Sequence, residues 1–430
     1  MNERNAHRTS IEELEPRTLL AGVTLVTHGR DGHLWGFVDT VVQDIMTARL
    51  GGTSQASEYI LKINLDTNSG LLYPTISHVA GTSTPANNPT GEILIELDYT
   101  SIDTNASYHL DYIAQVVRDF FVNTPVDGVR LAELPLHEIA ISRGTGLCDE
   151  IAKSLGEAGV WVDQETYCDP NPVEVMGDAS PTIYDNVAFV DDYWRSDGNP
   201  DNTSTNGSPT DGAYNLNVYW LDQYHDGWAL LHLLPGGYYV GTIDLTTTNG
   251  GEGPIYPEWY GNTPDKPARD QTGFIYSQIV SGAPRPLSGV WPASGGTGYR
   301  APGFTPSGAQ WPNLTDVSPV GGTTFSAGQT FPISYIYQDR DSGSSVTFYL
   351  DPDRNPYNNN YAATLATAQL SSSNSINSTQ TTASTSGVAS GTYWIAAKIA
   401  DAGGRFRFAY GKQVTLVNNS PPAAPTGLNA

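Results

Sequence analysis

Short apolar β-type runs alternate with amphipathic helical patterns through the first half of this chain. Val23–Thr27 is such a run, and a helical pattern with apolar residues three and four apart follows it until Gly51 and Gly52. Further strands are expected at Tyr59–Leu65, Ile93–Leu97, Leu136–Ile141, Val160–Tyr167 and Val187–Val190, and further helices at 107–122 and Arg143–Leu155. This alternation predicts a mostly parallel sheet covered by helices on both faces.

The second half of the chain has a different pattern. Residues 196–222 and 244–315 are rich in Gly, Pro, Asn or Ser and predict a long loop and a loop-rich extension. After residue 316, short alternating segments predict a small antiparallel Ig-like β-sandwich; they are Thr330–Tyr337, Ser345–Leu350, Tyr393–Ile399 and Phe406–Leu416. We therefore expect an N-terminal segment at 1–22, a first domain at 23–315, a sandwich at 316–418 and a linker at 419–430.

Charge and composition exclude several classes of protein. The chain has 45 acidic and 21 basic residues, a formal net charge of -24, and this balance argues against binding nucleic acid or anionic lipid. No apolar run approaches the roughly 18 residues that a membrane span needs. Cys148 and Cys168 are the two cysteines in the sequence, and we expect two buried thiols rather than a disulfide bridge.

The strongest chemical signal is Ala140-Ile141-Ser142-Arg143-Gly144, where an apolar strand gives way to a helix. A serine at such a corner needs small neighbours two residues before and after it, because strand and helix close on each other there. Ser142 is therefore the candidate nucleophile. The alternative is an ordinary turn serine at the start of a helix.

A nucleophilic serine needs a base, a carboxylate that orients the base, and donors for the oxyanion. Asp169 ends the strand that follows the serine helix and is the candidate acid, although an Asp-Pro turn is the plain alternative. His232 is the candidate base, with His225 as the second choice. His28-Gly29 follows the first strand, so the backbone N–H groups of Arg30 and Arg143 are the candidate oxyanion donors.

Taken together, these motifs resemble a lipase or esterase of the α/β-hydrolase family over residues 22–245. They are similar in particular to a bacterial group with an HSRG elbow, a DPHP acid motif, and a histidine before a WY-x-GTI stretch, here Tyr238–Ile243. The resemblance implies an α/β-hydrolase fold and ester hydrolysis by Ser142, Asp169 and His232. Ile141 and Asn171 depart from the histidines of that group and leave the substrate open.

The expected chemistry is acyl transfer to Ser142 from a small or polymeric ester, without an organic cofactor. A structural Ca²⁺ is a weaker suggestion at Asp351, Asp353 and Asn355, whose alternating oxygens suit a hard cation. A polar turn is the favoured interpretation of that segment. The β-sandwich is a candidate surface for contact with glycans or the cell surface.

Both ends of the chain indicate an exported bacterial protein. Leu14–Leu20 resembles the LEPR-x-LL motif of large exported proteins, and the final PPAAPTGLNA resembles the start of a fibronectin type III module. We therefore expect a secreted or surface-located fragment of a longer modular protein. The alternative function is a surface adhesion or carbohydrate-binding protein whose hydrolase-like domain is inactive, although the intact Ser–Asp–His order favours the enzyme.

Overall fold

The computed structural model describes residues 21–196, 207–224, 231–247, 255–277, 285–286 and 304–418. The Leu14–Leu20 motif, His225 and the terminal segment 419–430 lie outside these ranges, and the extension predicted over 244–315 is described only in part. Among the described residues, no helix is long and apolar enough to cross a membrane. Both cysteines are buried free thiols, as predicted.

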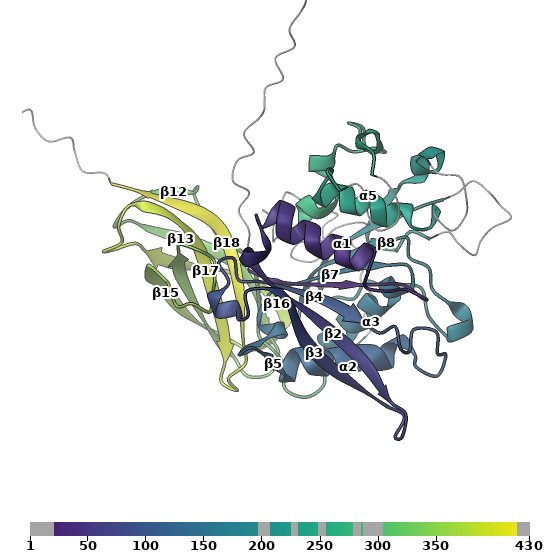
Figure 1. Ribbon diagram of the computed structural model, residues 1–430. Coiled ribbons are helices and arrows are strands. Elements are labelled where there is room, and N and C mark those ends of the chain that lie inside the picture. Colours follow the sequence, from purple (N-terminus) through teal and green to yellow (C-terminus); the bar gives the residue numbers. More distant parts are fainter. Residues whose placement is uncertain are drawn as a thin grey trace, which may run out of the picture.

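An eight-stranded sheet dominates the N-terminal part (Figure 1). Its order is β10-β9-β8-β7-β1-β4-β2-β3, and its pairs are parallel except that β3 runs antiparallel to β2. The strands are β1 (Val23–Thr27), β2 (Ala56–Asp66), β3 (Leu71–Gly81), β4 (Glu92–Asp98), β7 (Leu136–Ile141), β8 (Val162–Cys168), β9 (Val187–Trp194) and β10 (Tyr214–Asn217). A two-residue pair, β5 (Pro125–Val126) and β6 (Val129–Arg130), stands apart from this sheet.

Four α-helices occur in the described part of the chain: α1 (Phe37–Asp44), α2 (Leu110–Asn123), α3 (Arg143–Glu157) and α5 (Leu234–Ile243). α1 continues into one π-helical turn, η1 (Ile45–Arg49). The remaining helical segments are short 3-10 turns: η2 (Thr53–Gln55), η3 (Pro85–Asn87), η4 (Leu131–Glu133), η5 (Glu174–Met176), η6 (Tyr219–Tyr224), η7 (Pro257–Trp259), η8 (Arg269–Gln271) and η9 (Gly273–Tyr276).

The predicted fold class, an α/β-hydrolase fold with helices on both faces followed by one small all-β sandwich, is wrong. The structure is rich in sheet, with 39% strand against 23% helix, and contains several sheets and few helices. The expected alternation of strand and helix fails because β2 and β3 form an antiparallel hairpin. The connections from β3 to β4 and from β8 to β9 contain only the turns η3 and η5.

Two more sheets form the C-terminal part (Figure 1). One has the order β11-β13-β16 and the other β12-β18-β17-β14-β15. Their strands are β11 (Asn313–Pro319), β12 (Thr324–Ser326), β13 (Thr330–Asp339), β14 (Ser344–Asp351), β15 (Ala363–Leu370), β16 (Ser373–Ser384), β17 (Gly391–Asp401) and β18 (Phe406–Val417). A hydrophobic cluster joins the two sheets, with Ile333 and Tyr335 from one and Phe348 and Ile395 from the other. The domain boundaries predicted from the sequence stay predictions.

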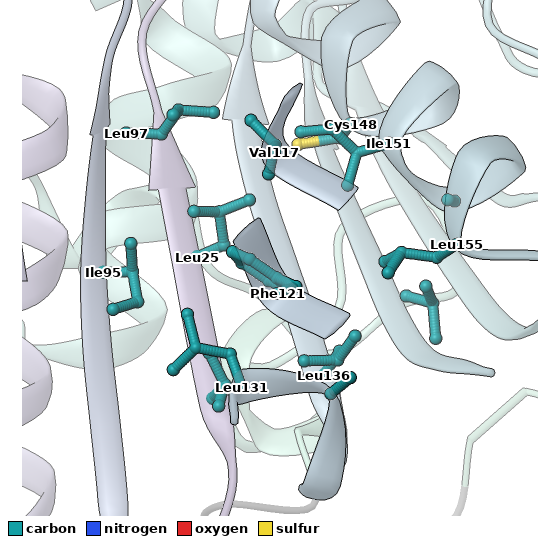
Figure 2. Packing of buried hydrophobic residues seen from close by; sticks show 14 of the residues in the cluster. Leu25, Ile95, Leu97, Val117, Phe121, Leu131, Leu136, Cys148, Ile151 and Leu155 are labelled. Carbon is teal, nitrogen blue, oxygen red and sulfur yellow. The ribbon is translucent and has the colours of Figure 1, made fainter. Parts of the chain in front are cut away.

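The hydrophobic core of the large sheet divides into two clusters because neighbouring strand residues point to opposite faces. Leu25 belongs to the cluster that contains α2 and α3, whereas Val26 belongs to the cluster that contains α1 and α5. Figure 2 shows Phe121 of α2 and Ile151 of α3 in the first cluster. The first cluster also includes Trp394, Phe408 and Tyr410 of the C-terminal sheets. The large sheet and the C-terminal sheets therefore both contribute side chains to this first cluster.

Direct hydrogen bonds also join the two parts. The backbone N–H of Trp161 donates to the Asn313 side chain over 2.9 Å, and the buried Arg407 guanidinium donates to the Leu134 carbonyl over 3.0 Å. These polar contacts fix the orientation in which the C-terminal sheets pack on the large sheet.

The buried Glu92 at the start of β4 makes stability depend on pH. Its Oε1 accepts a hydrogen bond of 2.9 Å from Thr24, and burial raises its pKa to about 8. The unfolded value is about 4.3, so at intermediate pH the folded protein keeps a proton that the unfolded chain has lost. The contribution of Glu92 to stability is therefore greatest below the unfolded pKa and falls as pH rises toward the folded pKa.

We predict that Glu92→Gln reduces the loss of unfolding free energy between about pH 5 and about pH 8, because glutamine does not titrate. Urea unfolding at both pH values measures the change. The exposed Glu258→Gln is the matched control and should leave the pH dependence unchanged. The same slope in the wild type and Glu92→Gln would contradict the role given to Glu92.

Candidate active site

Ser142 lies at the sharp turn between β7 and α3, with φ 59° and ψ -129°. This backbone conformation is rare for residues other than glycine and costs of the order of 1–3 kcal/mol. The neighbouring Gly144 has no room for a side chain, because a Cβ there would lie 2.4 Å from the carbonyl oxygen of His28. The sequence permits this turn because the residues two before and two after the serine, Ala140 and Gly144, are small.

Asp169 follows the last residue of β8 and is completely buried. One carboxylate oxygen, Oδ1, accepts the backbone N–H of Arg195 over 3.0 Å. The other, Oδ2, lies 2.6 Å from Nδ1 of His232. Burial raises the pKa of Asp169, while the hydrogen bond and charge of His232 and the charge of Arg195 act in the opposite direction.

His232 lies in the turn immediately before α5, and its side chain is 16% exposed. A carboxylate at Nδ1 favours the tautomer with the proton on that nitrogen, which leaves Nε2 as an acceptor. This is the orientation that a general base requires. The alternative base, His225, lies outside the described residues.

The segments that carry the three predicted residues lie at one edge of the large sheet. β7 and β8 are neighbours in register, with Ile141 opposite Cys168, so the residues that follow them lie side by side. The backbone N–H of Ser142 donates to the carbonyl of Cys168 over 2.9 Å. A Cβ on Gly236, in the first turn of α5, would lie 2.8 Å from Ile141, which places the His232 segment beside the serine strand.

No hydrogen bond joins Ser142 Oγ to His232 within the described residues. Hydrogen bonds between catalytic groups often tighten only when substrate binds. Asp169 and His232 are therefore directly paired, and Ser142 lies beside Asp169 through its hydrogen bond to Cys168.

The loop after β1 lies directly over the serine. A Cβ on Gly29 would be 2.6 Å from the Ser142 Cβ and 3.0 Å from its hydroxyl. His28 holds the loop through an Nδ1–H donated to the Gly29 carbonyl over 2.7 Å and through stacking on Tyr99 at 4.4 Å. Burial lowers the pKa of His28, which keeps this imidazole neutral.

The predicted oxyanion donors belong to this loop and to the start of α3. Among the described residues, neither the backbone N–H of Arg30 nor that of Arg143 donates to a protein acceptor. The first N–H groups of a helix have no partner within the helix and face whatever lies beyond its end. Both amides thus lack a protein acceptor among the described residues, and that of Arg143 directly follows Ser142 in the chain.

The Arg143 side chain has a structural role that the sequence did not reveal. Its guanidinium binds both oxygens of Asp178, over 2.6 and 2.9 Å, and donates to the carbonyl of Asp103. Asp178 raises the pKa of Arg143 against the effect of burial. Since Arg143 and Asp178 are both fully enclosed, this ion pair fixes the start of α3 and with it the Ser142 turn.

The residues suggested as calcium ligands instead form hydrogen bonds within a polar turn and to its neighbours. Asp351 accepts backbone N–H groups at Oδ1 and the Tyr410 hydroxyl at Oδ2, and Asp353 accepts two asparagine amides. Asn355 donates to the carbonyl of Pro85 over 2.9 Å. In the described part of the chain, no group of three or more His, Cys, Asp or Glu residues is placed to hold a metal ion. The calcium suggestion itself stays untested.

Comparison with known proteins assigns this chain to no family. No family model and no curated protein matches the chain. One similar solved structure is the PKD domain of an M14-like peptidase from Thermoplasmatales archaeon SCGC AB-540-F20, at 20% identity over 25% of this chain and 92% of that chain, with a TM-score of 0.15. Another is catalytically inactive OgpA from Akkermansia muciniphila in complex with an O-glycopeptide substrate, at 10% identity over 92% of each chain, with a TM-score of 0.20. Similarities this weak carry no argument about fold or function.

The strained turn makes a prediction about stability. Ser142→Gly should raise the free energy of unfolding by about 1 kcal/mol, because glycine adopts positive φ without the steric cost paid by serine. Chemical denaturation of the purified variant measures this. The same replacement inside α3, Ser154→Gly, should instead lower stability by about 0.5 kcal/mol through the poor helix propensity of glycine. Destabilisation by both replacements to the same extent would contradict the strain at Ser142.

Proposed function

We propose that this protein is a serine hydrolase that cleaves carboxylic esters through an acyl-enzyme on Ser142. The observation that supports it most is the 2.6 Å contact between the buried Asp169 and His232, next to a serine held in a strained turn. Strained backbone is costly and tends to occur where function requires a particular orientation. The proposal rests on this site and not on a fold class.

In the proposed mechanism, the Ser142 hydroxyl attacks the ester carbonyl while His232 Nε2 accepts its proton. Asp169 stays ionised and stabilises the imidazolium that forms. The carbonyl oxygen becomes an oxyanion and accepts hydrogen bonds from the backbone amides of Arg30 and Arg143. His232 then gives its proton to the leaving alcohol, and the acyl group remains on Ser142.

Water completes the cycle. His232 removes a proton from water as the water attacks the acyl-enzyme, and the Ser142 oxygen recovers a proton when the carboxylic acid leaves. The bonds made and broken require no metal or organic cofactor. Both a small ester and an ester group on a polymer fit this chemistry, and the proposed setting is outside the bacterial cell, where polymeric esters are accessible.

The electrostatics of the pair suit this role. Both Asp169 oxygens have donors, from His232 and from the Arg195 backbone, so the carboxylate can stay buried without an unsatisfied oxygen. A buried carboxylate beside an imidazole favours the protonated imidazole that forms during the reaction. The same pair orients the ring, which would otherwise rotate in its partly exposed position.

Hydrolysis of short p-nitrophenyl esters tests the proposal. Wild-type protein should release p-nitrophenol, and Ser142→Ala should lower kcat by at least about 10³-fold because the nucleophile is gone. His232→Ala should cause a loss of similar size, and Asp169→Asn should lower kcat by about 10⁴-fold by favouring the wrong tautomer.

Ser180→Ala is the matched control, because Ser180 is an exposed serine in the loop after β8 and has no part in the mechanism. This variant should keep wild-type activity. If wild type and Ser142→Ala hydrolyse the esters equally slowly, the enzyme proposal fails and the alternative of an inactive surface adhesion or carbohydrate-binding protein is favoured.

A further inference from the structure

Arg195 carries a buried positive charge beside the candidate active site, and the proposed mechanism does not use that charge. The residue directly follows β9, as Ser142 follows β7 and Asp169 follows β8. β7, β8 and β9 are parallel neighbours in the large sheet. Because the carboxyl ends of parallel strands lie at the same edge of a sheet, the fold places Arg195 at the edge that carries Ser142 and Asp169.

The backbone around Arg195 encloses the Asp169 carboxylate. The N–H of Arg195 donates to Asp169 Oδ1 over 3.0 Å. The next N–H, of Ser196, donates to the side chain of Asn217 at the end of β10 over 3.2 Å, so this segment is fixed on both sides. A Cβ on Gly207 would collide with the same Asp169 oxygen. Asp169 is completely buried, and protein groups replace water around it.

The Arg195 guanidinium joins this strand end to another segment. It is completely buried, and its Nη1 lies 3.5 Å from a carboxylate oxygen of Asp222 in η6. The Asp222 side chain is 32% exposed, so the arginine is the enclosed member of the ion pair. The charge of Arg195 also acts on Asp169, whose pKa it lowers against the effect of burial. One buried cation therefore interacts with two carboxylates.

The other ionisable groups described near Asp169 on β8 and β9 are acids. Burial raises the pKa of all three of these groups, which are Cys168, Asp191 and Asp192. His232 supplies a positive charge only when its ring is protonated, whereas an arginine is always charged in proteins. Arg195 is therefore a permanent counter-ion for Asp169 while His232 is neutral.

We propose that Arg195 and Asp222 form a positioning pair that sets the pH at which the Asp169–His232 pair takes up a proton. Arg195 stabilises ionised Asp169, and it opposes a second positive charge on the His232 ring, because like charges near one site repel. Asp222 limits this effect by partly neutralising the guanidinium. Arg195 acts through Asp169, so it is a positioning residue. The inference rests on the roles that the proposed function gives to Asp169 and His232.

NMR titration of the His232 ring in the full chain tests the proposal without requiring hydrolysis. The His232 signal is the one that is absent from His232→Gln. Arg195→Met keeps the backbone N–H and removes the charge, so it should raise the titration midpoint of His232 by about one pH unit. Arg195→Lys keeps the charge and should leave the midpoint within about 0.3 pH unit of the wild type. Arg118→Met is the matched control, because it removes a cation that pairs with Asp119 on α2, and it should leave the midpoint unchanged.

Asp222→Asn should shift the midpoint in the opposite direction. Removing this partly exposed carboxylate strengthens the effect of Arg195 and should lower the midpoint by about 0.3 pH unit. An unchanged midpoint in folded Arg195→Met, or an equal rise in Arg195→Lys, would overturn the proposal. If Arg195→Met does not fold, a midpoint that stays or rises in Asp222→Asn would overturn it.

The pH profile of ester hydrolysis separates this inference from the proposed function. The acidic limb of kcat/KM for p-nitrophenyl esters should move in the same direction as the His232 midpoint in each variant. Hydrolysis that depends on Ser142, without the predicted midpoint shifts, would overturn the positioning pair alone. The predicted shifts without any hydrolysis that depends on Ser142 would support the positioning pair and contradict the esterase.

Discussion

The site depends on how closely the loop after β1 approaches the start of α3. Two glycines permit this contact: a Cβ on Gly144 would lie 2.4 Å from the His28 carbonyl oxygen, and one on Gly29 would lie 2.6 Å from the Ser142 Cβ. Real Cβ atoms essentially never come so near to other heavy atoms. Any larger residue at either place would separate the loop from the helix and move Gly29 away from the Ser142 hydroxyl.

The large sheet holds the residues on both sides of this contact in place. β7 and β8 pair in register, so Ser142 and Asp169 emerge at neighbouring strand ends, and Ser142 bonds the last carbonyl of β8. The Arg143–Asp178 ion pair holds the first turn of α3 in place. Breaking one side of such an enclosed pair leaves a buried charge without a partner, so we regard it as part of the machinery that positions the serine.

Local sequence signals predicted the elements around the site well. The strand expected at Leu136–Ile141 has the same bounds in the structure, and the helix expected at Arg143–Leu155 runs on to Glu157. Their apolar spacing is regular and their boundary residues are small. Chain order and spacing also selected Asp169 and His232, which do make contact, although no local pattern could exclude His225.

The rest of the fold depends on features that local patterns do not contain. β16 was missed because its exposed face is rich in Ser, Thr and Asn and shows little apolar alternation. β3 was missed because Leu71, Tyr73 and Val79 lie on its exposed face, so its apolar residues do not alternate between a buried and an exposed side. The β2–β3 hairpin breaks the expected succession of strand and helix, and it contributed to the wrong fold class. Asp178 and the Arg195 amide reach the site from distant positions in the chain, and a single sequence does not reveal such pairings.

Covalent labelling with a fluorophosphonate, followed by mass spectrometry of the tagged peptide, tests the central claim most directly. This reagent reacts with a serine only when a neighbouring base activates it. We expect a single tag on Ser142 in the wild type and no tag in a folded His232→Ala variant. A tag on another serine, or none on the wild-type protein, would contradict the assignment of Ser142, His232 and Asp169 as one catalytic unit.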